Sequence, residues 1–357
     1  MLYEISEKAI QLENQGKKII KFNLGDPNLP TPPEIIEATY EAMKQGKTRY
    51  SSAAGEKELR EELAKIHGVS ADNVVVTTGS KWAIFSLMLL LLKKGGNVVV
   101  PSPHWTSYEL AARRVGAEIR FLRRDLDSGW KVDVSKLANL VDKDTQLLIL
   151  NSPNNPTSKI IQSKTFGEII QIAKERGATV LSDEIYSNIS FVETKSILDF
   201  GADNILVSGF SKTFAMTGWR IGYAVVEKEL AQKMIKLNQI TTTCVPAFIQ
   251  YGALKGLEFK KKIVNEIREQ FRKRVDLACS ILSKAKMKFS RPDAPFYLFP
   301  RVDGLDSEHF ALELLDRGVA IAPGTAFGDY REHFRMALSV PEKQIEEGLR
   351  KICEALP

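Results

Sequence analysis

Cysteine and histidine are scarce in this sequence of 357 residues, which contains three cysteines and four histidines. Cys244, Cys279 and Cys353 show neither the spacing of metal ligands nor the pattern of a disulfide framework, so we expect no metal site. A reducing compartment, the cytoplasm, is the expected location. The histidines form no arrangement like a Ser/His/Asp triad, which argues against a hydrolase of that kind.

Long apolar runs and blocks of one charge are also missing. The longest apolar stretch, residues 83–92, contains Ser86 and is about half as long as the roughly 20 residues of a membrane span. The N-terminus has acidic residues where a signal peptide has its apolar core. The net charge of +6 is spread along the chain, and its densest cluster, Lys260–Lys262, fits a solvated helix face. We therefore expect neither membrane nor nucleic acid as a partner. No G-x-G-x-x-G follows a predicted strand, which disfavours a dehydrogenase.

Short β-rich runs alternate with longer helical patterns between about residue 70 and residue 230. The predicted strands are 74–78, 97–100, 118–122, 146–150, 179–182, 205–207 and 221–225, and helices are predicted at 81–93, 108–115 and 164–176. This alternation indicates an α/β fold with a mostly parallel, seven-stranded sheet. Several strands are apolar throughout, as expected when helices cover both faces. Ligands of such sheets bind beyond the carboxyl ends of the strands.

The pattern changes after residue 256 and predicts a smaller α+β domain. One long, charged helix is predicted at 257–284, followed by strands at 296–299 and 334–338 and helices at 307–316 and 342–354. The first 20 residues predict an amphipathic helix, followed by a segment at 19–23 that we expect to pack on the small domain. The predicted division is a large domain of residues 28–265 and a small domain of residues 1–27 and 266–357.

Lys212 lies in the segment VSGFSKTFAMTGWRIG, residues 207–222. A reactive lysine must be partly neutral near pH 7, so its pKa has to fall from about 10.4 through burial or a nearby cation. Phe210 and Phe214 offer burial, and Arg220 offers the cation. The alternative is an exposed loop lysine, as most lysines are.

Three further features suggest binding chemistry. Asp183 ends a strand that is predicted to be buried, where a carboxylate could hold a cation, although many strands end in an acid. The TTGSK junction at 77–81 joins a strand to a helix, and such a helix N-terminus binds phosphate unless it is a plain turn. Arg335 lies in the apolar strand FRMAL, and a buried guanidinium needs either a core ion pair or a ligand carboxylate.

Together these segments resemble the pyridoxal-phosphate-dependent aminotransferases of class I/II, which have fold type I, and most closely the aspartate/aromatic group. The likeness runs from about residue 19 to the C-terminus. It rests on the order of the Lys212 segment, DEIY at 183–186, NSPNNPT at 151–157 and YSSAAGEKELR at 50–60. The implied fold is a large domain with a mostly parallel sheet plus a smaller α+β domain, and the implied cofactor is pyridoxal 5'-phosphate.

The resemblance implies a role for each motif residue. Lys212 would hold the cofactor as a Schiff base and move a proton between substrate and cofactor, Asp183 would pair with the ring nitrogen, and Tyr186 would bond the ring oxygen. The phosphate would be bound by Gly79, Ser80, Lys81, Ser211, Arg220 and, from the other subunit, Tyr50. Trp105 would contact the ring face and the substrate, and Asn155 the ring oxygen and the substrate carboxylate. Gly25 and Arg335 would contact the substrate. A homodimer with a composite active site would follow.

The implied reaction is ping-pong transfer of the amino group of an L-amino acid, of the aspartate or aromatic type, to a 2-oxo acid such as 2-oxoglutarate. β-Elimination, as in C–S lyases, is the alternative that uses the same residues. A regulatory protein on this fold would need a DNA-binding domain before residue 19, which we do not expect. The family usually has glycine where Ser158 stands. It often has glycine at one of the two positions that Ala294 and Pro295 occupy here. At Ser158 a positive φ would cost about 1 kcal/mol.

Overall fold

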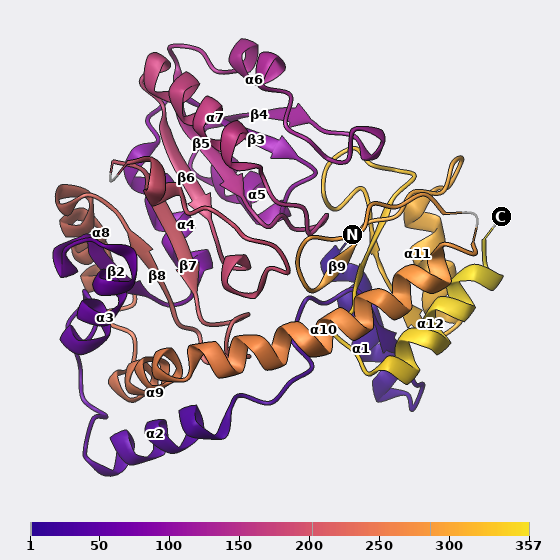
Figure 1. The fold of residues 1–357 in the computed structure, drawn as a ribbon, viewed down its shortest axis with the longest axis horizontal. Coiled ribbons are helices and arrows are strands. Elements are labelled where there is room, and N and C mark those ends of the chain that lie inside the picture. Colours follow the sequence, from indigo (N-terminus) through magenta and orange to yellow (C-terminus); the bar gives the residue numbers. More distant parts are fainter. Residues whose placement is uncertain (1, 202, 286, 357) are drawn as a thin grey trace.

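A seven-stranded sheet forms the centre of the larger part of the molecule (Figure 1). The computed structural model describes residues 2–201, 203–285 and 287–356. The strands are β2 (Val74–Thr77), β3 (Asn97–Ser102), β4 (Glu118–Arg123), β5 (Thr145–Asn151), β6 (Thr179–Asp183), β7 (Ile205–Gly209) and β8 (Gly222–Val225). Their order is β2-β8-β7-β6-β5-β3-β4, and β8 runs antiparallel to both of its neighbours. The predicted α/β fold with a mostly parallel sheet is confirmed.

Helices cover both faces of this sheet. The helices of the larger part are α2 (Pro33–Lys44), α3 (Lys57–His67), α4 (Ser80–Leu91), α5 (Thr106–Arg114), α6 (Val134–Leu140), α7 (Ser163–Arg176), α8 (Lys228–Ile240) and α9 (Ala247–Glu258), of which α2 and α9 lie outside the layers that cover the sheet. Helices α3, α6 and α7 share one apolar cluster with the sheet, and α4, α5 and α8 share another. Helices α3 and α7 end at Gly68 and Gly177 in the left-handed region that favours glycine.

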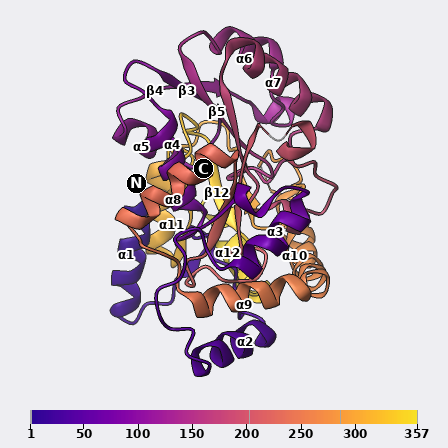
Figure 2. The same cartoon turned by 90° about the vertical axis from the view of Figure 1, so that its left-hand side faces the viewer.

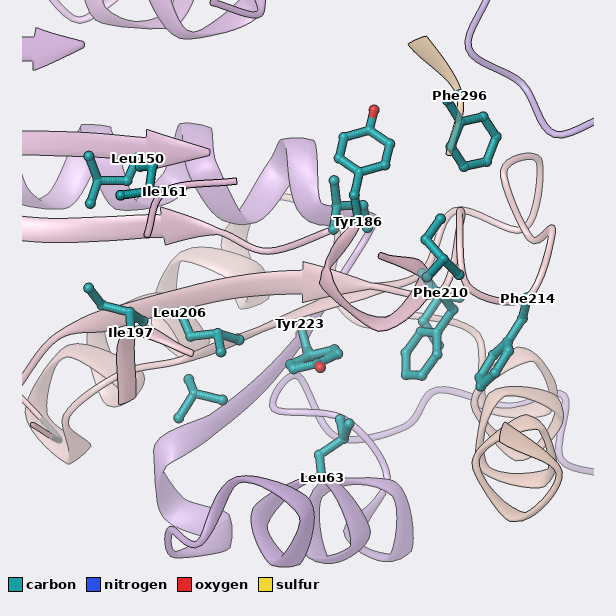
Figure 3. Packing of buried hydrophobic residues seen from close by; sticks show 14 of the residues in the cluster. Leu63, Leu150, Ile161, Tyr186, Ile197, Leu206, Phe210, Phe214, Tyr223 and Phe296 are labelled. Carbon is teal, nitrogen blue, oxygen red and sulfur yellow. The ribbon is translucent and has the colours of Figure 1, made fainter. Parts of the chain in front are cut away.

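The strand side chains alternate between these two clusters. Val74 and Val76 of β2 pack into the first cluster, whereas Val75 packs into the second. In β5, Leu148 belongs to the first cluster and Leu147 to the second, and both are fully buried. Figure 3 shows part of the first cluster. Each such side chain contributes about 1.5–3 kcal/mol by leaving water, which explains why these strands are apolar on both faces.

The smaller part contains two short sheets. Its elements are α1 (Leu2–Asn14), β1 (Ile20–Lys21), β9 (Tyr297–Leu298), α11 (Ser307–Asp316), β10 (Val319–Ala320), β11 (Ala322–Pro323), β12 (Phe334–Ala337) and α12 (Glu342–Glu354). Strand β1 pairs in parallel with β10, so the N-terminal segment packs on the C-terminal part as predicted. The domain bounds 28–265, 1–27 and 266–357 stay a prediction.

One long-helix prediction was wrong in its bounds. Helix α9 ends at Glu258, and α10 (Lys260–Leu282) begins after Phe259, whose φ of −97° and ψ of 7° separate the two helices. Figure 2 shows α2 lying along α9. Gly252 and Gly256 of α9 allow this approach, because a Cβ at Gly252 would collide with Thr39 of α2.

Over the part of the chain described here, no helix is both long and apolar enough to span a membrane.

Candidate active site

A cavity of about 400 Å³ lies at the carboxyl ends of the sheet strands and extends to the smaller part of the molecule. It brings together twelve of the thirteen predicted site residues: Gly25, Gly79, Ser80, Lys81, Trp105, Asn155, Asp183, Tyr186, Ser211, Lys212, Arg220 and Arg335. The sequence reasoning assigned no role to the other lining residues, Asn23, Leu24, Asp26, Tyr108, Asn151, Ile185, Thr217 and Tyr297.

Lys212 follows β7 and points its amine toward the N-terminal segment. Its Nζ donates a hydrogen bond to the carbonyl oxygen of Gly25 at 2.5 Å. Burial lowers the pKa of Lys212 to about 8; Asp26 opposes this shift, and the cations Arg335 and Arg220 add to it. At pH 7 a pKa of about 8 leaves about one amine in ten neutral, far more than for an ordinary lysine. The predicted activation of this lysine thus has a physical basis.

Asp183 ends β6 and is almost fully buried. Its Oδ2 accepts a hydrogen bond from the Tyr108 hydroxyl at 2.6 Å, and its Oδ1 accepts one from the Ile185 amide at 3.2 Å. Burial raises the pKa of Asp183 to about 6, and these two bonds limit the rise. The carboxyl is therefore mostly ionised at neutral pH and suits a cationic ring nitrogen. Sequence reasoning missed Tyr108; its place three residues after Trp105 on α5 was the available signal.

The N-terminus of α4 forms an anion cradle. Gly79 precedes the helix with a φ of 77°, and no side chain caps it. The first N–H groups of a helix have no partner within it and carry the positive end of its dipole. The Arg220 guanidinium lies against Gly79, since a Cβ there would come within 2.7 Å of Nη2. Glycine, open amides and a guanidinium together fit a phosphate group.

Arg335 of β12 is a buried cation without a carboxylate partner among the described residues. Its Nη1 donates to Asn155 Oδ1 at 2.9 Å and its Nη2 to the Asn23 carbonyl oxygen at 2.5 Å, while Nε is buried without a partner. The rings of Tyr297 and Phe327 flank the guanidinium at 4.5 and 4.8 Å. Burial lowers the pKa of Arg335, but an arginine stays charged in proteins. The structure therefore offers an anion site at this position.

Tyr297 connects several of these groups, although sequence reasoning gave it no role. Its hydroxyl shares a hydrogen bond of 2.9 Å with the hydroxyl of Tyr186. It also lies so close to Gly25 that a Cβ at Gly25 would collide with it. Trp105 makes an edge contact with Tyr108 at 5.4 Å and lies 4.9 Å from the Lys81 amine.

The two positions that depart from the family pattern contact each other. Ser158 adopts a φ of 53°, the positive value that the family's glycine suggested. Its Oγ donates to the Pro295 carbonyl oxygen at 3.2 Å and accepts from the Tyr297 amide at 3.1 Å. These two hydrogen bonds, each worth about 0.5–1.5 kcal/mol, offset the backbone strain of about 1 kcal/mol.

Tyr50 is the predicted site residue that lies outside the cavity. Its side chain is 88% exposed. The neighbouring Ser51 is anchored, because its amide donates to Cys244 Sγ at 3.4 Å and its hydroxyl to the Val245 carbonyl oxygen at 3.3 Å. The side chain of Tyr50 therefore projects into solvent from a segment that these hydrogen bonds hold in place.

A partly neutral lysine, a buried carboxylate and an anion cradle around one cavity suit pyridoxal phosphate. The class that this fold and this cavity define is the pyridoxal-phosphate-dependent transferases of fold type I. The family model described as aminotransferase class I and II matches residues 17–352. The chain belongs to this family and is a pyridoxal-phosphate-dependent transaminase.

Several relatives and solved structures resemble the chain over nearly its full length. An aspartate aminotransferase of Thermococcus kodakarensis is 36% identical over 96% of this chain and 90% of its own. An aspartate/prephenate aminotransferase of Thermus thermophilus is 32% identical over 99% of this chain and 94% of its own. The structure of a Thermus thermophilus aspartate aminotransferase with maleate covers 99% of this chain and 96% of its own, with a TM-score of 0.94 and 31% identity. These names do not favour β-elimination.

Proposed function

We propose that this transaminase takes an acidic L-amino acid of the aspartate type as amino donor and a 2-oxo acid such as 2-oxoglutarate as acceptor, in a ping-pong cycle. The observation that carries the proposal is the set of basic side chains around the cavity, Lys81, Lys212, Arg220 and Arg335. Lys212 and Arg220 are assigned to the cofactor and Arg335 to the substrate α-carboxylate. The Lys81 amine is therefore left to bind the second carboxylate of an acidic substrate.

The ionisable groups divide the chemistry among them. Bound pyridoxal phosphate supplies a conjugated ring that accepts the electron pair left at the substrate Cα. Lys212 would hold the cofactor until the substrate amine displaces it, and the released neutral amine would then take the proton from Cα and return it at C4′. Asp183 keeps the ring nitrogen protonated, because a buried carboxylate favours a cation beside it. Burial raises the pKa of Tyr186, so its hydroxyl stays neutral and donates toward the ring oxygen.

The anionic groups of cofactor and substrate are proposed to bind at opposite ends of the cavity. The amides of Ser80 and Lys81, together with Ser211 and Arg220, would hold the phosphate. The Gly79 amide already donates to the Thr77 carbonyl oxygen, so Gly79 would contribute the open space of a residue without a side chain. Arg335 would bind the substrate α-carboxylate, with Asn155 and Gly25 beside it, and Trp105 would contact the cofactor ring.

Lys81 distinguishes acidic from other donors. Its amine lies over Trp105 at 4.9 Å and has no ion pair with any residue that the structure describes. A hydrogen bond to a charged group contributes about 1.5–3 kcal/mol, so the loss of this contact should lower kcat/KM for aspartate at least about tenfold.

A donor panel tests this proposal. Single-turnover spectra with aspartate, phenylalanine and alanine should show the largest kcat/KM for aspartate, and Lys81→Ala should selectively reduce that value. Lys233→Ala, at an exposed lysine of α8, is the matched control. An aspartate preference that survives in Lys81→Ala would remove Lys81 from the substrate site.

We further propose that the enzyme acts as a homodimer in which Tyr50 reaches the phosphate in the partner subunit. An apolar hollow next to the cavity supports this, because it is lined by Lys81, Trp105 and Arg220 together with Phe85 and Leu110. Such a hollow beside a charged site suits a protein surface more than water. The cytoplasmic location expected from the cysteine content stays a prediction.

A subunit-mixing experiment tests the role of Tyr50. If Tyr50 acts across the interface, a mixed dimer of Tyr50→Ala and Lys212→Ala chains has one intact site. Random 1:1 mixing makes half of the dimers mixed, so activity should rise to about a quarter of wild type. Unchanged low activity after verified subunit exchange would show that Tyr50 does not act in trans.

A further inference from the structure

Tyr297 lines the candidate active site between two of its functional groups, and the roles proposed above leave it without one. Its side chain is buried, and its hydroxyl shares a hydrogen bond of 2.9 Å with the hydroxyl of Tyr186. Its ring lies against Arg335, with 4.5 Å between the guanidinium carbon and the ring centroid. One side chain thus contacts both the residue proposed to bond the cofactor ring oxygen and the residue proposed to bind the substrate carboxylate.

The small sheet sets the position of Tyr297 relative to Arg335. Tyr297 of β9 pairs with Ala337 of β12 in antiparallel register, and Arg335 lies two residues before Ala337 in the same strand. Side chains two residues apart in a strand point to one face, so Tyr297 and Arg335 are diagonal neighbours on that face. The Tyr297 amide is also held, by Ser158 Oγ at 3.1 Å. The contact between ring and guanidinium is therefore built into the strand pairing.

Phe296, which precedes Tyr297, has a strained backbone. Its φ of 88° is a value that a bulky side chain rarely adopts. Its ring packs on Phe271 and Tyr186, with centroid distances of 4.6 and 5.9 Å, and Figure 3 shows it beside Tyr186. Its carbonyl oxygen accepts a hydrogen bond from the Leu338 amide at 2.7 Å. Strain that is held in this way clusters at functional sites, and here it sets the direction in which the side chain of Tyr297 leaves the backbone.

The direction of the hydrogen bond between the two hydroxyls follows from their protons. Each tyrosine hydroxyl has one proton to donate. If Tyr186 donates its proton toward the cofactor ring oxygen, as proposed above, it can only accept from Tyr297. The Tyr297 hydroxyl has no other hydrogen-bond partner among the residues that the structure describes, so it is free to be the donor. A hydroxyl that accepts a hydrogen bond also donates more strongly, because neighbouring hydrogen bonds polarise one another.

We propose that Tyr297 is a positioning residue, whose hydroxyl aligns Tyr186 for the cofactor ring oxygen and whose ring aligns Arg335 for the substrate α-carboxylate. This role rests on those proposed above for Tyr186 and Arg335, and it adds the side chain that holds the two in register. Because the hydroxyl acts through Tyr186 and the ring acts through Arg335, substitution can separate the two contributions.

Two variants of Tyr297 separate them. Tyr297→Phe removes the hydroxyl and keeps the ring. It should lower the maximal rate of the half-reaction with aspartate, and weaken the binding of pyridoxal phosphate in a fluorescence titration, each by about threefold to tenfold, as expected for one hydrogen bond, with KM unchanged. Tyr297→Leu removes the ring as well and should also raise KM by about threefold or more, because Arg335 then has an aromatic ring, that of Phe327, on one side only.

Tyr223→Phe is the matched control. Tyr223 is also a buried tyrosine whose hydroxyl bonds another side chain, that of His67 at 3.0 Å, but it does not line the candidate active site. Its loss of a buried hydrogen bond should leave the maximal rate, KM and the affinity for pyridoxal phosphate unchanged. A Tyr297→Phe protein that matches Tyr223→Phe in all three would overturn the role of the hydroxyl, and equal KM values in Tyr297→Leu and Tyr297→Phe would overturn the role of the ring.

A double-mutant cycle with Tyr186→Phe shows whether the hydroxyl acts through Tyr186. In the Tyr186→Phe background, Tyr297→Phe should cause no further loss of rate or cofactor affinity, because the partner of the Tyr297 hydroxyl is already gone. Losses that add up would overturn the positioning role while leaving the proposed function intact. If Tyr186→Phe or Arg335→Ala were itself unimpaired, the role proposed for that residue would fail, and the corresponding part of the role of Tyr297 would fail with it.

Discussion

Replacement of Arg335 is the sharpest test of the candidate active site. Arg335→Ala removes the buried guanidinium, and Arg335→Lys keeps the charge but loses the fork that matches a carboxylate. In the structure, Nη1 and Nη2 already bond Asn155 and Asn23, while Nε has no partner. The substrate carboxylate would therefore supply the missing partner of the Arg335 guanidinium, which is already buried away from water.

The expected size of the effect follows from this burial. Arg335 is 3% exposed, so its attraction for a carboxylate is weakly screened. Removing one partner of a buried, hydrogen-bonded charge pair costs about 2–5 kcal/mol, or about thirtyfold to several thousandfold in kcat/KM. We expect Arg335→Ala to lie in this range and Arg335→Lys to lie between Arg335→Ala and wild type. Most of the loss should appear in KM, because the carboxylate is bound in both ground and transition states.

The assay is the half-reaction with aspartate, followed through the absorbance of the bound cofactor. Arg274→Ala is the matched control. Arg274 is also a buried arginine, but its Nε pairs with Glu342 Oε1 at a distance of 3.2 Å, and it does not line the cavity. Both alanine variants should lower the free energy of unfolding, and only Arg335→Ala should raise KM. An unchanged KM in Arg335→Ala, together with a loss of stability like that of Arg274→Ala, would make Arg335 a structural residue.

Three further predictions concern residues around the same cavity. The pKa of Lys212 is lowered to about 8, so its neutral fraction grows as the pH rises from 7 to 9. Stopped-flow absorbance should therefore show faster attachment of pyridoxal phosphate to the cofactor-free enzyme over that range. A rate that does not change with pH would contradict the lowered pKa. Gly25→Ala should weaken cofactor binding through collision with Tyr297, and fluorescence titration should show partial recovery in the double variant with Tyr297→Phe. Ser158→Gly should lower the free energy of unfolding by about 1 kcal/mol, since it loses two hydrogen bonds but relieves the strain; denaturation that shows a gain in stability would mean that strain dominates.

The sheet was predictable because its strands carry a strong local pattern. All seven predicted strands match β2 to β8 within a few residues, since most are short apolar runs bounded by polar or turn residues, and the edge strand β4 alternates apolar with charged residues. Helices α2, α3, α6, α8 and α9 were not predicted. In α9 the packing against α2 depends on Gly252 and Gly256, which a propensity argument counts against a helix. The break at Phe259 was also hidden, because an apolar residue continues the helical pattern of α10.

The site was predictable where one motif carries one role. Twelve of the predicted residues meet at one cavity, most of them because they lie at strand ends or helix starts that the fold brings together, and Arg335 because β12 borders the cavity. Tyr108 and Tyr297 were missed for a different reason. Their contacts with Asp183 and Tyr186 join segments 75 and 111 residues apart, and no local pattern reports such a pair.

The Ser158 and Pro295 positions show why departures from a family pattern are better judged in pairs. Taken alone, Ser158 has an unfavourable φ of 53°. The same hydroxyl, however, holds the Pro295 carbonyl and the Tyr297 amide, which belong to the other segment that lacks the family's glycine. A glycine at 158 would have no atom to hold that segment. Because Tyr297 bonds Tyr186 and flanks Arg335, the serine also fixes a ring that touches both the proposed cofactor site and the proposed carboxylate site. The strain at Ser158 is therefore better explained as part of the support of this cavity than as a defect in a loop.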